Sequence, residues 1–177
     1  MEYRSIHYWQ YEPDIQETLI LEEAVAFTGR ENEADLLQAI GCFIAKHTGA
    51  LYTMIALLAD DLKQASTVAF ITEKTVLPNI TYTLKGTPCD EVVTQRFCYY
   101  PLNVAQAFPE DKEFEEKKIE CYMGSILLSH NNEPLGLVAL MHDKPLQNVA
   151  FAEHLILVLS PTIEAELAKL KVMQVQS

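Results

Sequence analysis

Two long apolar segments joined by a short polar turn constrain the fold of this chain more than any other part of the sequence. The segments are CYMGSILLS at residues 121–129 and PLGLVALMHD at residues 134–143, with HNNE between them. This pattern predicts a β-hairpin. Nearly every position of both strands is apolar, whereas a strand with one solvated face alternates between apolar and polar residues. The hairpin is therefore expected to lie in a sheet that is covered on both faces.

The rest of the chain supplies the layers that such a sheet needs. Apolar residues recur at three- and four-residue spacing in three segments, which predicts helices over residues 14–28, 33–48 and 148–172. Shorter apolar runs predict further strands over residues 50–59, 66–72, 79–84 and 98–100. Ser160-Pro161 interrupts the last helix, so either this helix bends there or a new helix begins.

Local signals predict where several helices begin and end. Asp14 is expected to start the first helix and Gly29 to stop it, while Gly49 ends the second. A short helix is expected to begin at Thr87-Pro88, with the Thr87 hydroxyl capping backbone N–H groups. One or two short helices follow around Phe108-Pro109, where Asp111 can cap the second.

Composition and charge exclude several classes of function. The 177 residues suit one domain with a substantial core. Thirteen Lys and Arg residues against 25 Asp and Glu residues give a net charge of −12, which disfavours binding to nucleic acid or to an anionic membrane surface. The longest apolar runs are too short to span a bilayer as a helix. We therefore expect a cytoplasmic protein without a membrane or nucleic-acid partner.

The four cysteines show no pattern typical of a metal site. Cys42, Cys89, Cys98 and Cys121 form no CxxC pair, and the five histidines form no HExxH motif. Reduced thiols are therefore expected, with Cys42 as a small residue on the core side of its helix. Cys89 at a helix start has two interpretations. The helix dipole favours a thiolate, but Asp90 and the next carboxylate oppose it, so packing beneath the helix is the favoured role.

Five short motifs occur in order along the second part of the chain. They are Gly86-Thr87-Pro88-Cys89, Cys98-Tyr99, Phe108-Pro109-Glu110-Asp111, Tyr122-Met123-Gly124, and Leu135-Gly136 followed by Asp143-Lys144-Pro145. Together they resemble the GAF domain, in the version found in bacterial sensor proteins with diguanylate cyclase or histidine kinase outputs. The resemblance implies an N-terminal extension with a helix at residues 1–30 and the domain, with its C-terminal signalling helix, at residues 31–177.

The resemblance implies an α/β (α+β) fold with a central, mostly antiparallel sheet of five to six strands between helical layers. The N- and C-terminal helices pack on one side, and short helices cover a small-molecule pocket on the other. It implies a regulatory domain and not an enzyme, acting in two-component or cyclic-di-GMP signalling, although it identifies neither the ligand nor a cofactor. The candidate pocket residues are Tyr82, Cys89, Cys98, Tyr99, Cys121, Tyr122 and Met141.

The expected protein partners are a second copy of the chain, bound through the terminal helices, and a C-terminal output domain. The last helix carries an apolar stripe that continues toward AKLKVMQVQS, beyond the expected edge of the domain. A surplus stripe of this kind is typical of a helix pair in a dimer or of a connection to a following domain. We therefore expect a homodimer through the terminal helices, and an output domain of the diguanylate cyclase or histidine kinase type.

Two alternatives involve cysteine chemistry. Cys89, Cys98 and Cys121 are expected to converge over one face of the sheet, at positions similar to those of the cysteines in free methionine-R-sulfoxide reductase. In that family a thiolate attacks the sulfoxide sulfur, and a second thiol resolves the sulfenic acid as a disulfide. The flanking KKIECYMGSILL lacks the acidic Asn-Ser-Glu stretch of that enzyme. A covalent bilin, as in phytochrome-like GAF domains, is disfavoured because no cysteine here is followed by histidine.

Overall fold

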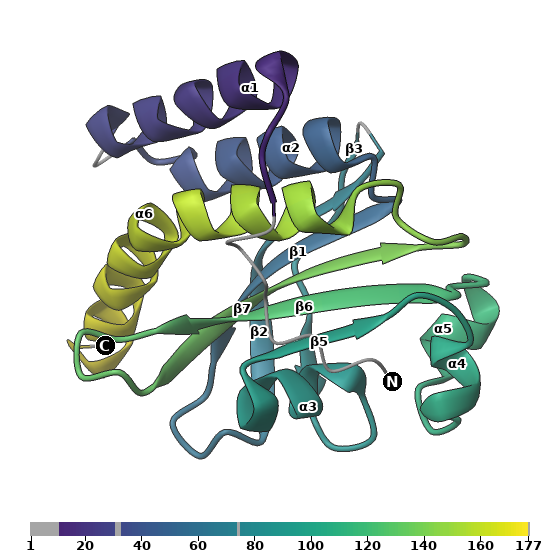
Figure 1. Ribbon diagram of the computed structural model, residues 1–177. Helices are drawn as coiled ribbons and strands as arrows, with labels where there is room; N and C mark the ends of the chain where they lie inside the picture. The colour runs from purple at the N-terminus through teal and green to yellow at the C-terminus, as the bar shows by residue number, and fades with distance from the viewer. Residues whose placement is uncertain (1–10, 31–32, 74, 177) are drawn as a thin grey trace.

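The computed structural model describes residues 11–30, 33–73 and 75–176. These residues form a seven-stranded antiparallel sheet in the order β3-β2-β1-β7-β6-β5, with β4 also pairing with β2 (Figure 1). The predicted hairpin is confirmed and lies inside the sheet, with Ser125 paired to Val138. The strands are β1 Tyr52–Leu58, β2 Gln64–Thr72, β3 Thr75–Val76, β4 Thr81–Thr83, β5 Phe97–Tyr100, β6 Cys121–Leu128 and β7 Pro134–His142.

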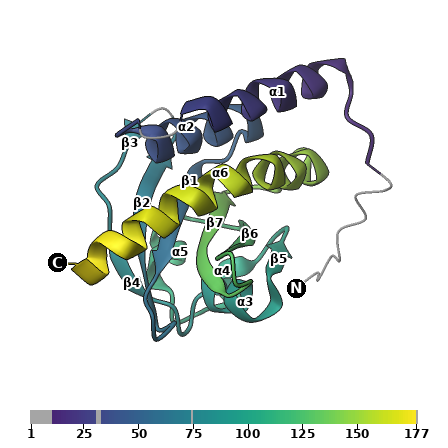
Figure 2. The same ribbon diagram turned by 90° about the vertical axis from the view of Figure 1, so that its left-hand side faces the viewer.

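Helices cover both faces of this sheet, as predicted. The long helices α1 (Ile15–Val25), α2 (Leu36–Thr48) and α6 (Val149–Gln176) lie on one face. The short helices α3 (Pro88–Gln95), α4 (Val104–Ala107) and α5 (Lys112–Glu116) lie on the other. Figure 2 shows the two layers from the side, with the sheet between them. The α1 helix packs against α6, so this N-terminal helix belongs to the same layer as the C-terminal one.

The strands divide their apolar side chains between two separate cores. In β1, Ile55 and Leu57 belong to the core under α1, α2 and α6, whereas Met54 and Leu58 belong to the core under the short helices. Successive side chains of a strand point to opposite faces, so an apolar residue at every position supplies both cores at once. We call these two regions the helical core and the pocket-side core.

Two glycines of the predicted hairpin allow the layers to approach closely. A Cβ atom on Gly136 would overlap the carbonyl oxygen of Ala56 and lie 2.6 Å from Cδ1 of Leu167 on α6. A Cβ atom on Gly124 would overlap Val92 on α3 and lie 2.6 Å from the Tyr122 hydroxyl. The absence of a side chain at both positions therefore brings a helix against the sheet on each face.

The helix ends follow the sequence in part. Asp14 caps α1 with a capping box, and Gly49 ends α2 in the left-handed conformation at φ 70°. Gly29 does not stop the first helix, because a 3₁₀ turn continues through Ala26–Arg30. The predicted start of α3 at Thr87-Pro88 is confirmed, but the Thr87 hydroxyl does not cap it, because this hydroxyl donates a 2.7 Å hydrogen bond to the Leu84 carbonyl oxygen.

The interruption at Ser160-Pro161 bends one helix and does not begin a second one. The α6 helix runs without a break from Val149 to Gln176, and Figure 1 shows that it changes direction partway along. Pro161 has no N–H to donate to the Leu157 carbonyl, and a proline ring also crowds that turn. The Ser160 hydroxyl donates a 2.7 Å hydrogen bond to the Ile156 carbonyl oxygen, which is a further cause of bending.

The prediction for Cys42 is wrong. Cys42 is exposed on α2, because the buried face of this helix is formed by Leu36, Ile40, Gly41, Ile44 and Ala45. Its apolar neighbours in sequence and the small size of cysteine favour a core position. The rotation per residue of the helix instead places Cys42 on the face that is turned away from the core. Among the described residues, no helix combines the length and the hydropathy that crossing a membrane requires.

Candidate ligand pocket

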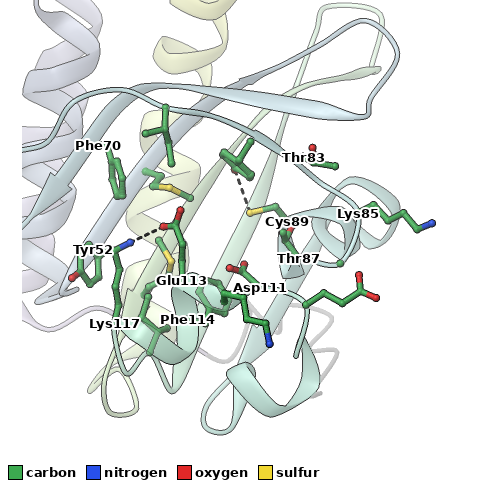
Figure 3. Close-up of a pocket in the computed structure, with 18 residues that line it drawn as sticks. Tyr52, Phe70, Thr83, Lys85, Thr87, Cys89, Asp111, Glu113, Phe114 and Lys117 are labelled. Carbon is green, nitrogen blue, oxygen red and sulfur yellow. Dashed lines mark hydrogen bonds and ion pairs between the residues drawn. The ribbon is translucent and has the colours of Figure 1, made fainter.

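A cavity of about 300 Å³ lies between the pocket-side face of the sheet and the segments that carry α3 and α5. It falls at the small end of the range for ligand sites. Figure 3 shows side chains from strands, loops and helices around it. The lining residues are Tyr52, Met54, Phe70, Ile80, Tyr82, Thr83, Lys85, Gly86, Thr87, Cys89, Glu110, Asp111, Lys112, Glu113, Phe114, Lys117, Ile119 and Met141.

Three adjacent strands supply the apolar floor of the cavity. Met54 of β1 is paired with Phe70 of β2, and Tyr52 of β1 is paired with Met141 of β7. The rings of Tyr52 and Phe70 lie 6.3 Å apart between centroids, at an interplanar angle of 45°. Because these side chains share one face of the sheet, the strand register alone brings them together.

Asp111 and Phe114 approach the cavity from the opposite side. Asp111 is the residue that precedes α5, and its carboxylate lies among the lining side chains in Figure 3. Burial raises the pKa of the Asp111 carboxyl and the neighbouring Glu113 carboxylate raises it further, more than the backbone N–H groups of Glu113 and Phe114 lower it. Phe114 is buried, and its ring lies 6.2 Å from that of Tyr122 between centroids. The cavity therefore combines apolar walls with a poorly solvated carboxyl group.

Three lysines line the pocket, namely Lys85, Lys112 and Lys117. Lys117 donates a 2.6 Å hydrogen bond to Glu113 four residues earlier, and Figure 3 shows this pair beside Tyr52. Lys85 points its amino group away from the cavity in the same view. Arg96 ends α3 in the left-handed conformation and is not among the lining residues.

A contact between two loops closes one side of the rim. Gly86 has φ +82°, and a Cβ atom there would lie 2.6 Å from the Glu110 carboxylate oxygen Oε2. Glycine is the residue that adopts this backbone conformation at no steric cost. The loop before α3 and the loop before α5 therefore touch where any larger residue would separate them.

Cys89 forms part of a buried polar cluster beside the cavity. Its sulfur lies 3.1 Å from the Tyr122 hydroxyl, and the Tyr82 hydroxyl donates to it at 3.4 Å. Burial raises the pKa of the Cys89 thiol more than these hydrogen bonds lower it. Burial also raises the pKa of both tyrosines. The cluster is therefore neutral, and the packing role favoured for Cys89 agrees with its place beneath the start of α3.

The structure separates the predicted pocket residues into three groups. Tyr82, Cys89 and Met141 line the cavity. Tyr122 and Cys98 belong to the pocket-side core but lie behind the lining, where Tyr122 contacts Cys89 and the Cys98 sulfur lies 3.7 Å from the Pro88 carbonyl oxygen. The remaining two residues, Tyr99 and Cys121, belong to the helical core.

The prediction that three cysteines converge over one face of the sheet is therefore wrong. Cys121 lies on the opposite face from Cys89 and Cys98, because strand β6 turns the side chains of Cys121 and Tyr122 to opposite sides. Burial raises the pKa of all three thiols. The geometry does not bring together the thiol pair that a methionine-sulfoxide reductase using Cys121 requires, and it disfavours the thiolate form.

Several lining residues were missed in the sequence. Tyr52, Met54 and Phe70 sit in apolar strands whose pairing the sequence does not reveal, although alternation along β1 could have placed the first two on one face. Asp111 was expected only as a helix cap. Asp111 precedes a helix of five residues. Its position in the Phe-Pro-Glu-Asp motif is the sequence feature that could have indicated a place in the pocket.

No protein-family model matches this sequence, and no curated protein matches it. Solved structures are similar to it in fold. The GAF domain of an Acinetobacter phosphoenolpyruvate-protein phosphotransferase superposes with a TM-score of 0.69 at 12% identity, over 92% of this chain and 99% of that one. The nlh2 GAF domain of A. aeolicus, in an inactive state, gives 0.62 at 11% identity, over 89% and 98%.

A phytochrome fragment is similar as well. The chromophore-binding domain of Stigmatella aurantiaca phytochrome P1 gives a TM-score of 0.63 at 9% identity. The match covers 88% of this chain but only 61% of that one, so this chain corresponds to part of the phytochrome fragment. These likenesses show that the chain has the GAF fold.

Proposed function

From the GAF fold and the pocket geometry, we propose that this chain is a sensory and regulatory domain. It binds a small molecule in the cavity and passes the bound state to an output domain through its terminal helices. The observation that carries this proposal is the position of the cavity. It lies on one face of the sheet, and the terminal helices α1 and α6 lie on the other.

The strands between the two faces give a physical route for coupling. Met54 lines the cavity, and the next residue, Ile55, packs into the helical core. A ligand that moves Met54 and its strand also shifts the surface on which α6 rests. Such a shift matters only if the ligand binds one arrangement of the helices more tightly than another, since equal binding changes no population.

Two side chains of α6, Lys171 and Glu164, make polar contacts at the ends of strands. Lys171 donates to the carbonyl oxygen of Leu58, the last residue of β1, and pairs with Asp60 at 2.8 Å. Glu164 accepts a 2.9 Å hydrogen bond from the Leu128 N–H at the end of β6. These contacts support the proposal because they join the helix to the sheet at fixed points, one of them on a strand that lines the cavity.

The chromophore named for the phytochrome relative is not proposed for this chain. Covalent attachment needs a reactive thiol, whereas Cys89, the cysteine that lines the cavity, is buried beside two tyrosines with its pKa raised. We propose a reversibly bound ligand instead. Colour in the purified protein would contradict this part of the proposal.

We also propose a homodimer through the terminal helices. On α1, Ile15 is 84% exposed and Leu19 is 54% exposed, which is unusual for apolar residues on one helix face. On α6, Met173 and Val175 are 64% and 79% exposed. Light scattering at tens of micromolar tests this proposal. A mass of one chain would contradict it, and the double change Ile15→Glu with Leu19→Glu should lower the mass from two chains to one.

Native mass spectrometry of the purified protein tests ligand binding directly. A retained small molecule should give a mass above that of the chain, and Met141→Trp, which fills the cavity, should remove it. Leu157→Trp is the matched control, because it adds an indole at a partly exposed position on α6, outside the lining. Retention of the molecule by the filled variant would show that it binds elsewhere and would contradict the proposed site.

A further inference from the structure

Two hydroxyl groups that line the cavity already donate their protons within the protein. The Thr87 hydroxyl donates its proton to the Leu84 carbonyl at 2.7 Å, and the Tyr82 hydroxyl donates its proton to the Cys89 sulfur at 3.4 Å. Each oxygen keeps lone pairs that can accept. The Asp111 carboxylate is itself an acceptor with two oxygens. Three lining groups therefore present acceptors, and a ligand that carries N–H or O–H donors would satisfy them.

Two of the three lysines that line the cavity are not directed at a ligand. Lys117 is engaged by Glu113 at 2.6 Å, and Lys85 points outward (Figure 3). Among the described residues, the structure records no ion pair for Asp111 within 4.0 Å. An anionic ligand would have to displace the Glu113 carboxylate from Lys117 or be held by Lys112, the third lysine of the lining, whereas a cationic one would meet the Asp111 carboxylate without breaking an existing ion pair.

The walls of the cavity suit a cation with an apolar body. Tyr52, Phe70, Tyr82 and Phe114 all line it. The face of an aromatic ring attracts an ammonium group, and the attraction grows when both are removed from water. The chain as a whole carries a net charge of −12, so its field also raises the local concentration of small cations.

We propose that this pocket binds a small organic cation, with an ammonium group donating to Asp111 and an apolar or aromatic body held against Tyr52, Phe70 and Phe114. The Tyr82 and Thr87 oxygens accept the remaining N–H donors. This inference rests on the proposed small-molecule binding function and names the class of ligand. It assigns Asp111 as the residue that determines specificity for charge.

Three probes that share one body test the proposal. They are 2-phenylethylamine, 2-phenylethanol and 3-phenylpropionate, which are cationic, neutral and anionic at neutral pH. Titration of each into the whole chain, followed by ¹H–¹⁵N NMR shifts of pocket residues, gives three dissociation constants. The amine is expected to bind at least about tenfold more tightly than the alcohol, because it makes a hydrogen bond to a charged group. The acid is expected to bind more weakly than both.

Two carboxylate variants assign the preference to one residue. Asp111→Asn should reduce the advantage of the amine over the alcohol to about twofold or less, since the charge partner is gone. Asp90→Asn removes the same charge from α3 at a residue outside the lining, and it should keep the advantage. Thermal unfolding of both variants establishes that each is folded under the conditions of the titration.

The outcomes separate this inference from the proposed function. Equal binding of the three probes, tighter binding of the acid, or an amine preference that survives Asp111→Asn would each overturn the cation proposal. If the probes nevertheless shift pocket resonances, and Met141→Trp abolishes those shifts, the small-molecule function stands. If no probe binds at millimolar concentration, the cation proposal fails for this cavity, and the native mass measurement decides the proposed function separately.

Discussion

The two faces of the sheet use the same strands in opposite ways. On the helical face, residues such as Ile55, Leu140 and Leu159 are fully buried in a continuous core beneath long helices. On the other face, Met54, Phe70 and Met141 border a cavity of about 300 Å³. Short helices and loops cover this face, and the lining includes charged residues. The helical core around these buried residues is filled, whereas the pocket-side core is left partly hollow.

This difference separates stability from binding within one domain. A closely packed face contributes burial of apolar area and van der Waals contact, whereas a cavity gives up those contacts along its lining. The cavity therefore lowers the free energy of unfolding of the empty domain. A ligand that fills the cavity and binds only the folded chain raises that free energy again. The comparison predicts that equal changes on the two faces have unequal effects.

The largest effect is expected from neighbouring residues of β1. Ile55→Ala should lower the free energy of unfolding by about 4 kcal/mol, because it opens a new void in a filled core. Met54→Ala should lower it by about 2 kcal/mol, since part of that side chain already borders a cavity. Urea unfolding of both variants measures the two losses. Equal losses would show that the pocket face is as well packed as the helical one.

The two glycines that bring helices close give the next largest effect. Gly136→Ala should cost about 3 kcal/mol, because the added methyl group meets a backbone oxygen that cannot rotate away. Gly124→Ala should cost less, about 2 kcal/mol, since the added methyl group meets the side chains of Val92 and Tyr122 and no backbone atom. A reversed order in thermal unfolding would refute this ranking of the two faces.

Asp111 should lower the stability of the folded chain at neutral pH when the pocket is empty. Its folded pKa is raised, mainly by burial and then by Glu113, so its stabilising contribution is complete below the unfolded pKa and is lost as pH rises through the folded one. Asp111→Asn should therefore be more stable than the parent chain at neutral pH, by about 0.5 kcal/mol once screening of the half-exposed carboxyl is allowed for.

Urea unfolding at neutral and at acidic pH tests this expectation. The stability difference between Asp111→Asn and the parent should shrink as pH falls below the raised pKa, because the protonated carboxyl and the amide are then similar in charge. A gap that widens with falling pH would contradict the sign of the shift.

The smallest effect on stability is expected from changing Cys42. Thiol labelling should nevertheless distinguish this exposed cysteine from the buried ones. Cys42 is exposed, whereas Cys89, Cys98 and Cys121 are buried with raised pKa values. We expect one thiol per native chain to react rapidly with an aromatic disulfide reagent, and the other three only on unfolding. Cys42→Ser should abolish the rapid reaction and change the unfolding free energy by about 0.5 kcal/mol or less.

The sequence predicted the sheet well because strand and hairpin signals are local. Nearly continuous apolar segments indicated a doubly covered sheet, and the turn HNNE fixed the pairing of β6 with β7. The site was predicted less well because it depends on which face a residue points to. A shift of one residue moves a side chain to the other core, as Tyr122 and the adjacent Cys121 show.

The bend at Pro161 has a mechanical consequence. Beyond Pro161, the rest of α6 forms an arm about 22 Å long, at about 1.5 Å per residue, that points in a new direction. A change of about 5° in the bend would move the far end by about 2 Å, by the geometry of a lever of that length. Lys171 holds this arm to the end of β1, the strand that carries Tyr52 and Met54. A displacement too small to disturb the sheet can thus become a large one at the tip.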